Sequence, residues 1–393
     1  MAVRNYFARI HEDMTAWRRD FHQHPELGFD LPRTASRVAE LLRSFGCDEV
    51  VEGIAQSGVV ATIRGRTTAS GRAIGLRADI DALPIEETTG LAYASQTPGK
   101  MHACGHDGHT AMLLGAARYL SETRNFDGVA VLIFQPAEED GCGGKLMVEE
   151  GIMERFGVSE VYAMHNLPGI PTGKFAIRHG SIMGSTDEFE IHVSGRGGHP
   201  ASPHKTIDTT MIAAQILLSL NTIVSRDVSP LGRVALGVTT FNTDSRASNI
   251  IAQNVVMEGT IRTLEPEYRE RVKARVEEIT HGIANAFRAK ASVTWIEGYP
   301  TTVNTADQTE HAILVARDVA GEVDTNAEPL LQAEDFSYML QARPGAFMFI
   351  GNGDTPMLHD PGYYFDDEAM PSGASWFAGM IETRLPVNQE RNV

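Results

Sequence analysis

The residues best suited to chemistry in this sequence form one short segment, Cys104-Gly105-His106-Asp107-Gly108-His109. It brings a thiol, two imidazoles and a carboxylate together within six positions, two of the six being glycine. A cysteine and a histidine two residues apart can bind one metal ion, because glycine lets the backbone bend until both side chains point inward. The segment therefore predicts one part of a metal centre.

Four further groups of acidic residues or histidines follow apolar segments that read as strands, or lie in adjoining loops: Asp79/Asp81, Glu138/Glu139, His165 and His359. In an open α/β sheet the carboxyl ends of parallel strands face one crevice, so residues far apart in sequence can meet there. Each group alone has an ordinary structural explanation, such as a turn or cap residue. Their coincidence favours one shared metal site.

The ligand types narrow the choice of metal. Thiolate, imidazole and carboxylate together suit Zn²⁺, Mn²⁺, Co²⁺ or Ni²⁺ better than Mg²⁺ or Ca²⁺, which prefer oxygen ligands alone. Five groups exceed the needs of one tetrahedral ion, so we expect two ions ~3.5–4 Å apart. One carboxylate of the Glu138-Glu139 pair can bind metal while its neighbour takes a proton from water. Such a site would hydrolyse an amide or an ester.

The elements that must position these residues alternate between helices and apolar strands. Helical spacing covers residues 8–22, 33–45 and 109–120, and strand-like segments cover 59–63, 73–76, 129–134 and 161–164. This alternation predicts an α/β fold with a mostly parallel sheet, to which segments 308–320 and 346–350 also belong. Between them, residues 188–296 follow the β-α-β-β-α-β order of a ferredoxin-like domain. We therefore predict a discontinuous domain of residues 1–183 and 299–393, with residues 184–298 inserted as a smaller domain.

Composition limits the partners and the compartment. The chain of 393 residues has 34 basic and 51 acidic residues, a net charge of −17, which disfavours binding to nucleic acid or to an anionic membrane. Three cysteines cannot build a disulfide framework, and an odd count fits a reducing compartment. The N-terminal residues do not read as a signal peptide, and no apolar run approaches 18 residues. We expect a cytoplasmic protein.

The chain resembles the metal-dependent amidohydrolases that include hippurate hydrolase, N-acyl-amino-acid amidohydrolases and plant indole-acetyl-amino-acid hydrolases. The resemblance spans nearly the full length and rests on residues 18–28, 76–84, 102–110, 134–139, 165–166, 197–201, 334–336 and the segment at His359. It implies a metallopeptidase-like catalytic domain in which Glu138 is the general base and later the acid to the leaving amine. It also implies that two metal ions are bound by Cys104, His106, Glu139, His165 and His359.

One position departs from the wider clan of aminopeptidases and carboxypeptidases. The clan places His-x-Asp on the first strand, whereas this chain has Asp79-Ile80-Asp81, so that histidine ligand is missing. The resemblance implies that Cys104 and His106 supply the ligation instead. Asp81 matches the aspartate that orients a ligand or the base in the clan. His109 is expected beside the ligands rather than among them.

The resemblance gives the inserted domain three site residues. His199, in a Gly-Gly-His-Pro turn, resembles the histidine that stabilises the tetrahedral oxyanion. Asn249 and Arg262 resemble the pair that binds the free carboxylate of the substrate. In related clan members the histidine comes from the partner subunit, which implies a homodimer, or a higher homo-oligomer, through residues 184–298.

The leading functional prediction is hydrolysis of a small-molecule N-acyl amino acid with an aromatic or hydrophobic acyl group. An N-acetyl amino-acid deacetylase, or a detoxifying aryl-amide hydrolase, is an alternative on the same scaffold. A third alternative is a catalytically silent metal-binding protein, which the intact Glu138-Glu139 pair disfavours.

Overall fold

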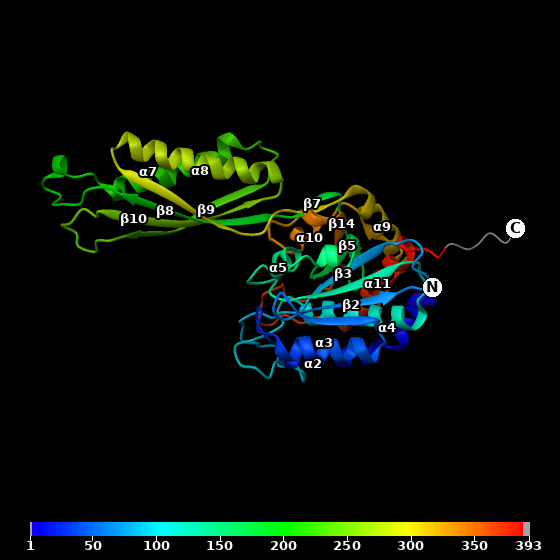
Figure 1. Cartoon of the computed structure of the whole chain (residues 1–393). Coiled ribbons are helices and arrows are strands. Elements are labelled where there is room, and N and C mark those ends of the chain that lie inside the picture. The colour runs from blue at the N-terminus through cyan, green and yellow to red at the C-terminus, as the bar shows by residue number, and fades with distance from the viewer. Residues whose placement is uncertain (1, 388–393) are drawn as a thin grey trace. The chain divides into compact units, whose positions relative to one another are not determined.

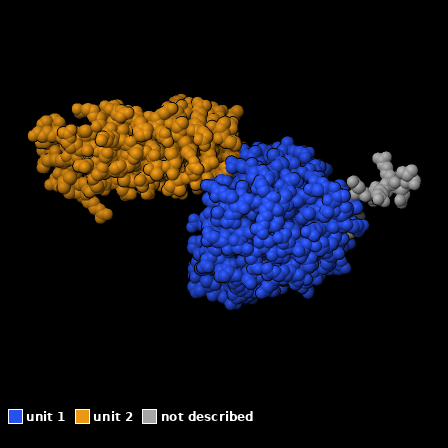
Figure 2. Space-filling model, viewed as in Figure 1, with its two compact units in different colours: residues 1–182, 303–328, 335–393 blue, residues 183–302, 329–334 orange. Residues whose placement is uncertain are grey.

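The computed structural model describes residues 2–387 and divides into two compact units (Figure 2). The first unit comprises residues 1–182, 303–328 and 335–393, and the second comprises residues 183–302 and 329–334. The sequence pattern placed these boundaries at residues 183/184 and 298/299, and it assigned residues 329–334 to the larger domain. That short segment joins the second unit instead, where Leu330 pairs with Met183 in a β-bridge.

The first unit is built on an eight-stranded sheet (Figure 1). Its strands, in spatial order, are β1 (Glu49–Ile54), β2 (Gly58–Arg64), β4 (Val129–Gln135), β3 (Ala73–Asp79), β5 (Val158–Leu167), β14 (Gly345–Gly351), β6 (Phe175–Ala176) and β13 (Val323–Asp324). The four central strands β4, β3, β5 and β14 run parallel, and β1 and β2 continue the sheet antiparallel. The predicted α/β fold is confirmed. The four parallel strands end at the same edge of the sheet.

Nine α-helices of the described residues belong to the first unit: α1 (Ala2–Arg9), α2 (His11–Gln23), α3 (Pro32–Ser44), α4 (His106–Thr123), α5 (Gly143–Glu149), α6 (Ile152–Arg155), α9 (Ala306–Ala320), α10 (Phe336–Ala342) and α11 (Met370–Arg384). Helix α4 is buried along almost its whole length and contacts α2 and α11. It starts three residues before the predicted helix, directly after Gly105, whose φ of 85° lies in the left-handed region that favours glycine. The helix thus carries His106 on its first turn.

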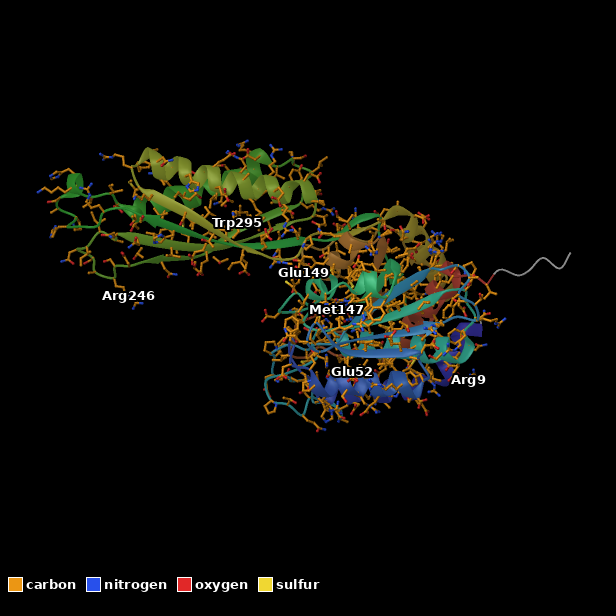
Figure 3. All side chains as sticks on the ribbon, viewed as in Figure 1. Arg9, Glu52, Met147, Glu149, Arg246 and Trp295 are labelled. Carbon is orange, nitrogen blue, oxygen red and sulfur yellow. The ribbon has the colours of Figure 1, made fainter. Side chains whose placement is uncertain are left out.

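The second unit has the predicted β-α-β-β-α-β order: β8 (Ser185–Ser194), α7 (Thr209–Thr222), β9 (Val234–Thr243), β10 (Asn254–Thr263), α8 (Pro266–Ala286) and β11 (Lys290–Glu297). Its antiparallel sheet has the order β11-β8-β10-β9, and both helices cover one face (Figure 1). Alternate residues of β8, such as Phe189 and Ile191, are buried there. Trp295 on β11 donates to Glu277 of α8 at 2.9 Å (Figure 3).

Shorter elements complete the described chain. They are the strand pair β7 (Gly180–Met183) and β12 (Thr302–Asn304), the 3₁₀ turns η1 (Pro203–Lys205) and η3 (Asp367–Ala369), and the π-helical segment η2 (Ile223–Asp227). Within residues 2–387, the helices are too short or too polar to cross a membrane.

Candidate metal centre

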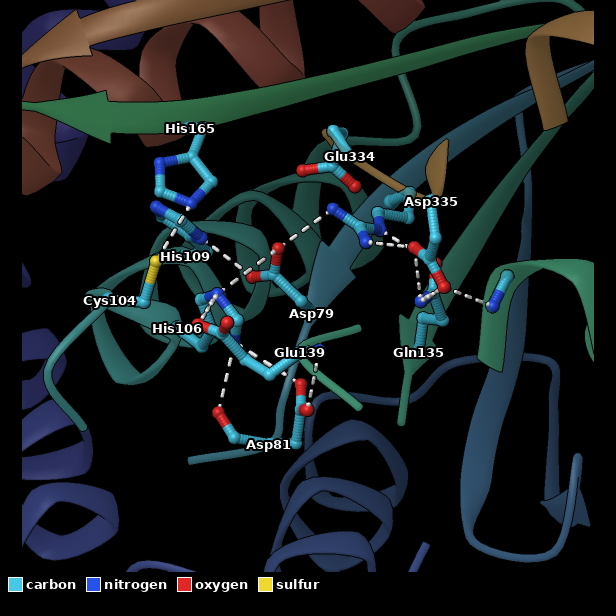
Figure 4. Close-up of polar contacts among 12 residues, drawn as sticks. Asp79, Asp81, Cys104, His106, His109, Gln135, Glu139, His165, Glu334 and Asp335 are labelled. Carbon is cyan, nitrogen blue, oxygen red and sulfur yellow. Dashed lines mark hydrogen bonds and ion pairs between the residues drawn. The ribbon is translucent and has the colours of Figure 1, made fainter. Parts of the chain in front are cut away.

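The predicted ligands meet at the edge where the parallel strands of the first unit end. Figure 4 shows four of them, Cys104, His106, Glu139 and His165. His165 lies near the end of β5, Glu139 follows β4, and His359 lies in the loop after β14. Cys104 precedes α4, and His106 is the first residue of that helix. Residues spread over more than half of the chain are therefore brought to one place by the order of the strands.

Contacts link all five predicted ligands in a chain. Cys104 Sγ lies 3.4 Å from His165 Nε2. Glu139 Oε1 lies 3.7 Å from His106 Nε2 and 3.4 Å from His359 Nε2. Ligand atoms of Cys104, His106 and Glu139 all lie within 4.8 Å of one another. This spacing suits a shared metal centre.

Asp81 holds two of these ligands in place. Its backbone carbonyl and its Oδ1 accept from His106 Nδ1, at 2.9 and 3.2 Å, and its Oδ2 accepts from the backbone N–H of Glu139 at 3.1 Å. Because Nδ1 of His106 is engaged in this way, its Nε2 faces the other ligands. Asp81 is almost fully buried, and this burial raises the pKa of its carboxyl group.

The donor atoms fit a divalent cation. His106 Nε2 is buried and, among the described residues, has no hydrogen-bond partner; Asp79 and Glu139 oxygens face it at 3.7 Å. Burial disfavours the charged imidazole, but Asp79 and Asp81 raise the pKa of His106 to about 10. Burial, together with Glu139, raises the pKa of the Cys104 thiol. A divalent ion bound by these groups would displace the protons of the thiol and of His106 Nε2.

Two further histidines have defined tautomers. His165 Nδ1 donates to the backbone carbonyl of Asn166 at 2.7 Å, so its Nε2 presents a lone pair towards Cys104. Burial and the neighbouring His109 ring lower the pKa of His165 to about 3, which keeps the ring neutral. His109 donates from Nδ1 to Asp79 at 2.6 Å and accepts at Nε2 from the Asn166 N–H at 2.9 Å. Both of its ring nitrogens are used within the protein, as expected for a residue beside the ligands.

A buried network beside the ligands centres on Arg77. Its guanidinium donates to Asp79 at 2.7 Å, to Gln135 at 2.9 Å and to Asp335 at 3.0 Å. A carboxylate oxygen of Glu138, the predicted general base, lies within 4.8 Å of a carboxylate oxygen of Asp335. The sequence interpretation gave Arg77, Gln135 and Asp335 no role. The available signal was a charged arginine inside an otherwise apolar strand.

A second buried network involves Asp107, which belongs to the same segment as Cys104. Asp107 Oδ2 accepts from Arg18 Nη1 at 3.1 Å and from His22 Nδ1 at 2.9 Å, and all three side chains are buried. Arg18 also pairs with Asp367 at 2.5 Å. Burial disfavours the charged His22 ring, but Asp107 outweighs this effect and raises the pKa of His22 to about 9. His22 is thus a buried cation in this network.

Non-glycine residues with left-handed backbone lie on the loops that carry the site. They are Ala137 (φ 52°), Cys142 (φ 56°) and His359 (φ 67°). Such conformations cost ~1–3 kcal/mol each and persist where the surrounding structure imposes them. The loops that carry Glu138, Glu139 and His359 are therefore held in defined conformations.

The three remaining predicted site residues all belong to the second unit. His199 is exposed and accepts at Nδ1 from the backbone N–H of Ala201 at 3.1 Å. Asn249 is exposed, and Arg262 is half-buried on β10. Their roles stay predictions from the resemblance.

Comparison with known proteins agrees with this geometry. The family model "Peptidase family M20/M25/M40" matches residues 75–383. The hippurate hydrolase of Campylobacter jejuni is 38% identical over 92% of this chain and 94% of its own length. The N-acetyl-L-cysteine deacetylase of Bacillus subtilis is 38% identical over 98% of this chain and 91% of its own length. The crystal structure of the Bacillus subtilis YXEP protein, a dinuclear metal-binding peptidase from the M20 family, is 32% identical with a TM-score of 0.85 and covers 96% of this chain and 99% of its own. This chain belongs to peptidase family M20/M25/M40.

Proposed function

We propose that this protein is an amidohydrolase that cleaves the amide bond of N-acyl amino acids at a centre of two divalent metal ions. The observation that carries the proposal is the convergence of one thiol, three imidazoles and a carboxylate at the ends of parallel strands. All of these groups except the His359 ring are labelled in Figure 4. The proposed ligands are Cys104, His106, Glu139, His165 and His359. This mixed set of donors favours Zn²⁺, Mn²⁺, Co²⁺ or Ni²⁺.

The proposed site residues of the first unit then have distinct roles. Bound metal ions would lower the pKa of water to ~7 and so make hydroxide available at neutral pH. Glu138 takes the proton of the attacking water and passes it to the leaving amine. Its carboxylate is buried, and it is the neighbour in sequence of the proposed ligand Glu139. Asp81 keeps His106 and Glu139 in the orientation needed for ligation.

The second unit is proposed to complete substrate binding. His199 would donate to the developing oxyanion, while Asn249 and Arg262 would bind the free carboxylate of the substrate. A homodimer through residues 184–298 is part of this proposal. It is supported by an edge strand, β9, and by the apolar side chains of Leu218 and Met211 on α7, which are 69% and 43% exposed. A cytoplasmic location remains a prediction from the sequence.

The test of the mechanism compares Glu138→Gln with Glu149→Gln, an exposed glutamate on α5 (Figure 3). Glu138→Gln should bind metal normally but hydrolyse N-benzoylglycine ~10²–10⁴ times more slowly, because the general base is lost. Glu149→Gln should keep wild-type turnover. Full activity in Glu138→Gln would exclude this residue as the base. Hydrolysis that survives complete removal of metal by a chelator would exclude the metal mechanism.

The acyl group of the substrate has two candidates. A hippurate hydrolase and an N-acetyl-L-cysteine deacetylase are equally identical to this chain, at 38%. A panel of benzoyl, acetyl and indole-acetyl derivatives of one amino acid would decide between aromatic acyl groups and acetyl. A preference in kcat/KM for acetyl would favour the deacetylase. Loss of all turnover in a metal-loaded protein would favour the silent metal-binding alternative.

A further inference from the structure

Asn166 connects three separate parts of the first unit at the metal centre. It is fully buried near the end of β5, directly after His165. Its amide Nδ2 donates to the backbone carbonyl of Cys104 at 2.6 Å. Its amide Oδ1 accepts from the hydroxyl of Tyr363, on the loop after β14, at 2.7 Å. One side chain thus joins β5, the segment before α4 and the loop towards the C-terminus.

The orientation of this amide is fixed by its partners. A backbone carbonyl can only accept, so the amide NH₂ must face Cys104 and the amide oxygen must face Tyr363. Tyr363 is itself fully buried, and burial raises the pKa of its hydroxyl well above the usual range. The hydroxyl therefore stays protonated and remains a donor. The Cys104 carbonyl thus sets which way the Asn166 amide points, and the Tyr363 hydroxyl holds the amide oxygen on the opposite side.

The backbone of Asn166 also acts on two histidines. Its carbonyl accepts from Nδ1 of His165 at 2.7 Å, and its N–H donates to Nε2 of His109 at 2.9 Å. The first bond leaves Nε2 of His165 unprotonated and directed at Cys104 Sγ, 3.4 Å away. The second engages Nε2 of His109, which the amide Nδ2 of Asn166 also contacts at 3.1 Å. Asn166 therefore controls the geometry on both sides of the contact between Cys104 and His165.

Gly105 shows how closely the Cys104 segment packs on this amide. A Cβ atom at position 105 would lie 2.3 Å from Asn166 Nδ2 and 2.6 Å from the hydroxyl oxygen of Tyr363. Such approaches are far inside van der Waals contact, so only glycine lets the segment reach Asn166. The hydrogen bond from the Asn166 amide to the Cys104 carbonyl therefore links the cysteine directly to the strand that carries His165.

We propose that Asn166 is the positioning residue for the Cys104–His165 half of the metal centre, and that the Tyr363 hydroxyl holds its amide in place. This inference rests on the proposed function, because it takes Cys104 and His165 as metal ligands. The other half, His106 and Glu139, is held by Asp81. Different residues thus hold the two halves in position, and substitution of Asn166 should lower the metal affinity of one site more than that of the other.

The experiment titrates metal-stripped protein with Co²⁺ alone, in competition with a chromophoric chelator, and follows the thiolate-to-Co²⁺ absorption band. Asn166→Ala keeps the backbone bonds to His165 and His109. It loses the side-chain bonds to the Cys104 carbonyl and to the Tyr363 hydroxyl, and the contact of Nδ2 with His109 Nε2 at 3.1 Å. It should bind one Co²⁺ equivalent ~10–100-fold more weakly than wild type, with a reduced thiolate band. The matched control is Asn304→Ala. Asn304 is also buried, and its side chain forms hydrogen bonds to backbone groups of Arg178 and Phe347.

The control should lower the melting temperature without changing either Co²⁺ affinity. Tyr363→Phe keeps the buried ring and loses only the hydroxyl, so it provides a folded variant that should show the same selective weakening, by several-fold. Wild-type affinity for both ions in Asn166→Ala or in Tyr363→Phe would overturn the inference. A wild-type protein that binds no Co²⁺ would instead overturn the proposed metal centre, so the two failures are distinguishable.

Discussion

Replacing Asp107 with asparagine would remove the negative charge that two buried cations share. Its Oδ2 accepts from Arg18 at 3.1 Å and from His22 at 2.9 Å, and all three side chains are buried. Asparagine has the same shape, so the change alters charge and hydrogen bonding rather than packing. Removing one partner from a buried ion pair costs ~3–5 kcal/mol of unfolding free energy. After the change, His22 keeps only Glu87 as an acidic partner among the described residues, with the Glu87 Oε2 3.4 Å from its Nε2. Arg18 likewise keeps only Asp367. We expect a loss in that range at pH 6.

The loss should depend on pH in a defined direction. Folding raises the pKa of His22 from its ordinary value of 6.5 to about 9. The stabilisation from its charged form is therefore complete below pH ~6.5 and disappears as the pH rises through ~9. At ~1.4 kcal/mol per pKa unit, this amounts to about 3 kcal/mol. Because the imidazole of the wild type is neutral at pH 10, Asp107→Asn should cost only about 1 kcal/mol there, mainly through Arg18, which retains Asp367.

The assay is urea unfolding of metal-stripped protein at pH 6 and pH 10. A Trp295→Phe background leaves Trp17 and Trp376, both in the first unit, as the fluorescent reporters. The control is Asp127→Asn, a buried aspartate that accepts from the backbone N–H of Ser70, and its cost should be the same at both pH values. A cost for Asp107→Asn below 1 kcal/mol at pH 6, or an equal cost at the two pH values, would refute the reasoning.

Four other outcomes are expected. Gly143→Ala should destabilise the first unit by ~3 kcal/mol or more in urea unfolding, because the new Cβ would lie 1.7 Å from the carbonyl oxygen of Pro136. Gly46→Ala, with φ of 82° but open space around it, should cost only ~1 kcal/mol. Cys104→Ser should weaken Zn²⁺ binding more than Mn²⁺ binding in a chelator competition, because Zn²⁺ prefers the softer sulfur; an equal loss would argue against thiolate ligation. Leu218→Glu should give monomers in analytical ultracentrifugation, and a monomeric wild type would rule out the proposed dimer.

The sequence predicted those features that leave a local pattern. Continuous apolar runs such as 129–134 mark buried parallel strands, and the ends of such strands locate the proposed ligands His165 and Glu139. Strand β1 was missed because Glu49–Ile54 is half-exposed and carries two glutamates. The Arg77–Asp335 bond was missed because the two residues lie 258 positions apart, and no local pattern around either residue indicates its partner. The same holds for Tyr363 and Asn166, which are 197 positions apart.

The burial of α4 has a consequence for how this protein tolerates change. The helix begins with His106, and its body lies in the core, where Gly115 and Met112 pack closely against neighbours. A side chain at Gly115 would approach Met14 at 2.9 Å, and one at Gly373 would approach Met112 at 2.0 Å. Substitutions that disturb this packing are therefore expected to shift helix α4, which carries the proposed ligand His106. Mutations far from the reaction should reduce metal retention and heat resistance together, which makes metal content a sensitive measure of core integrity.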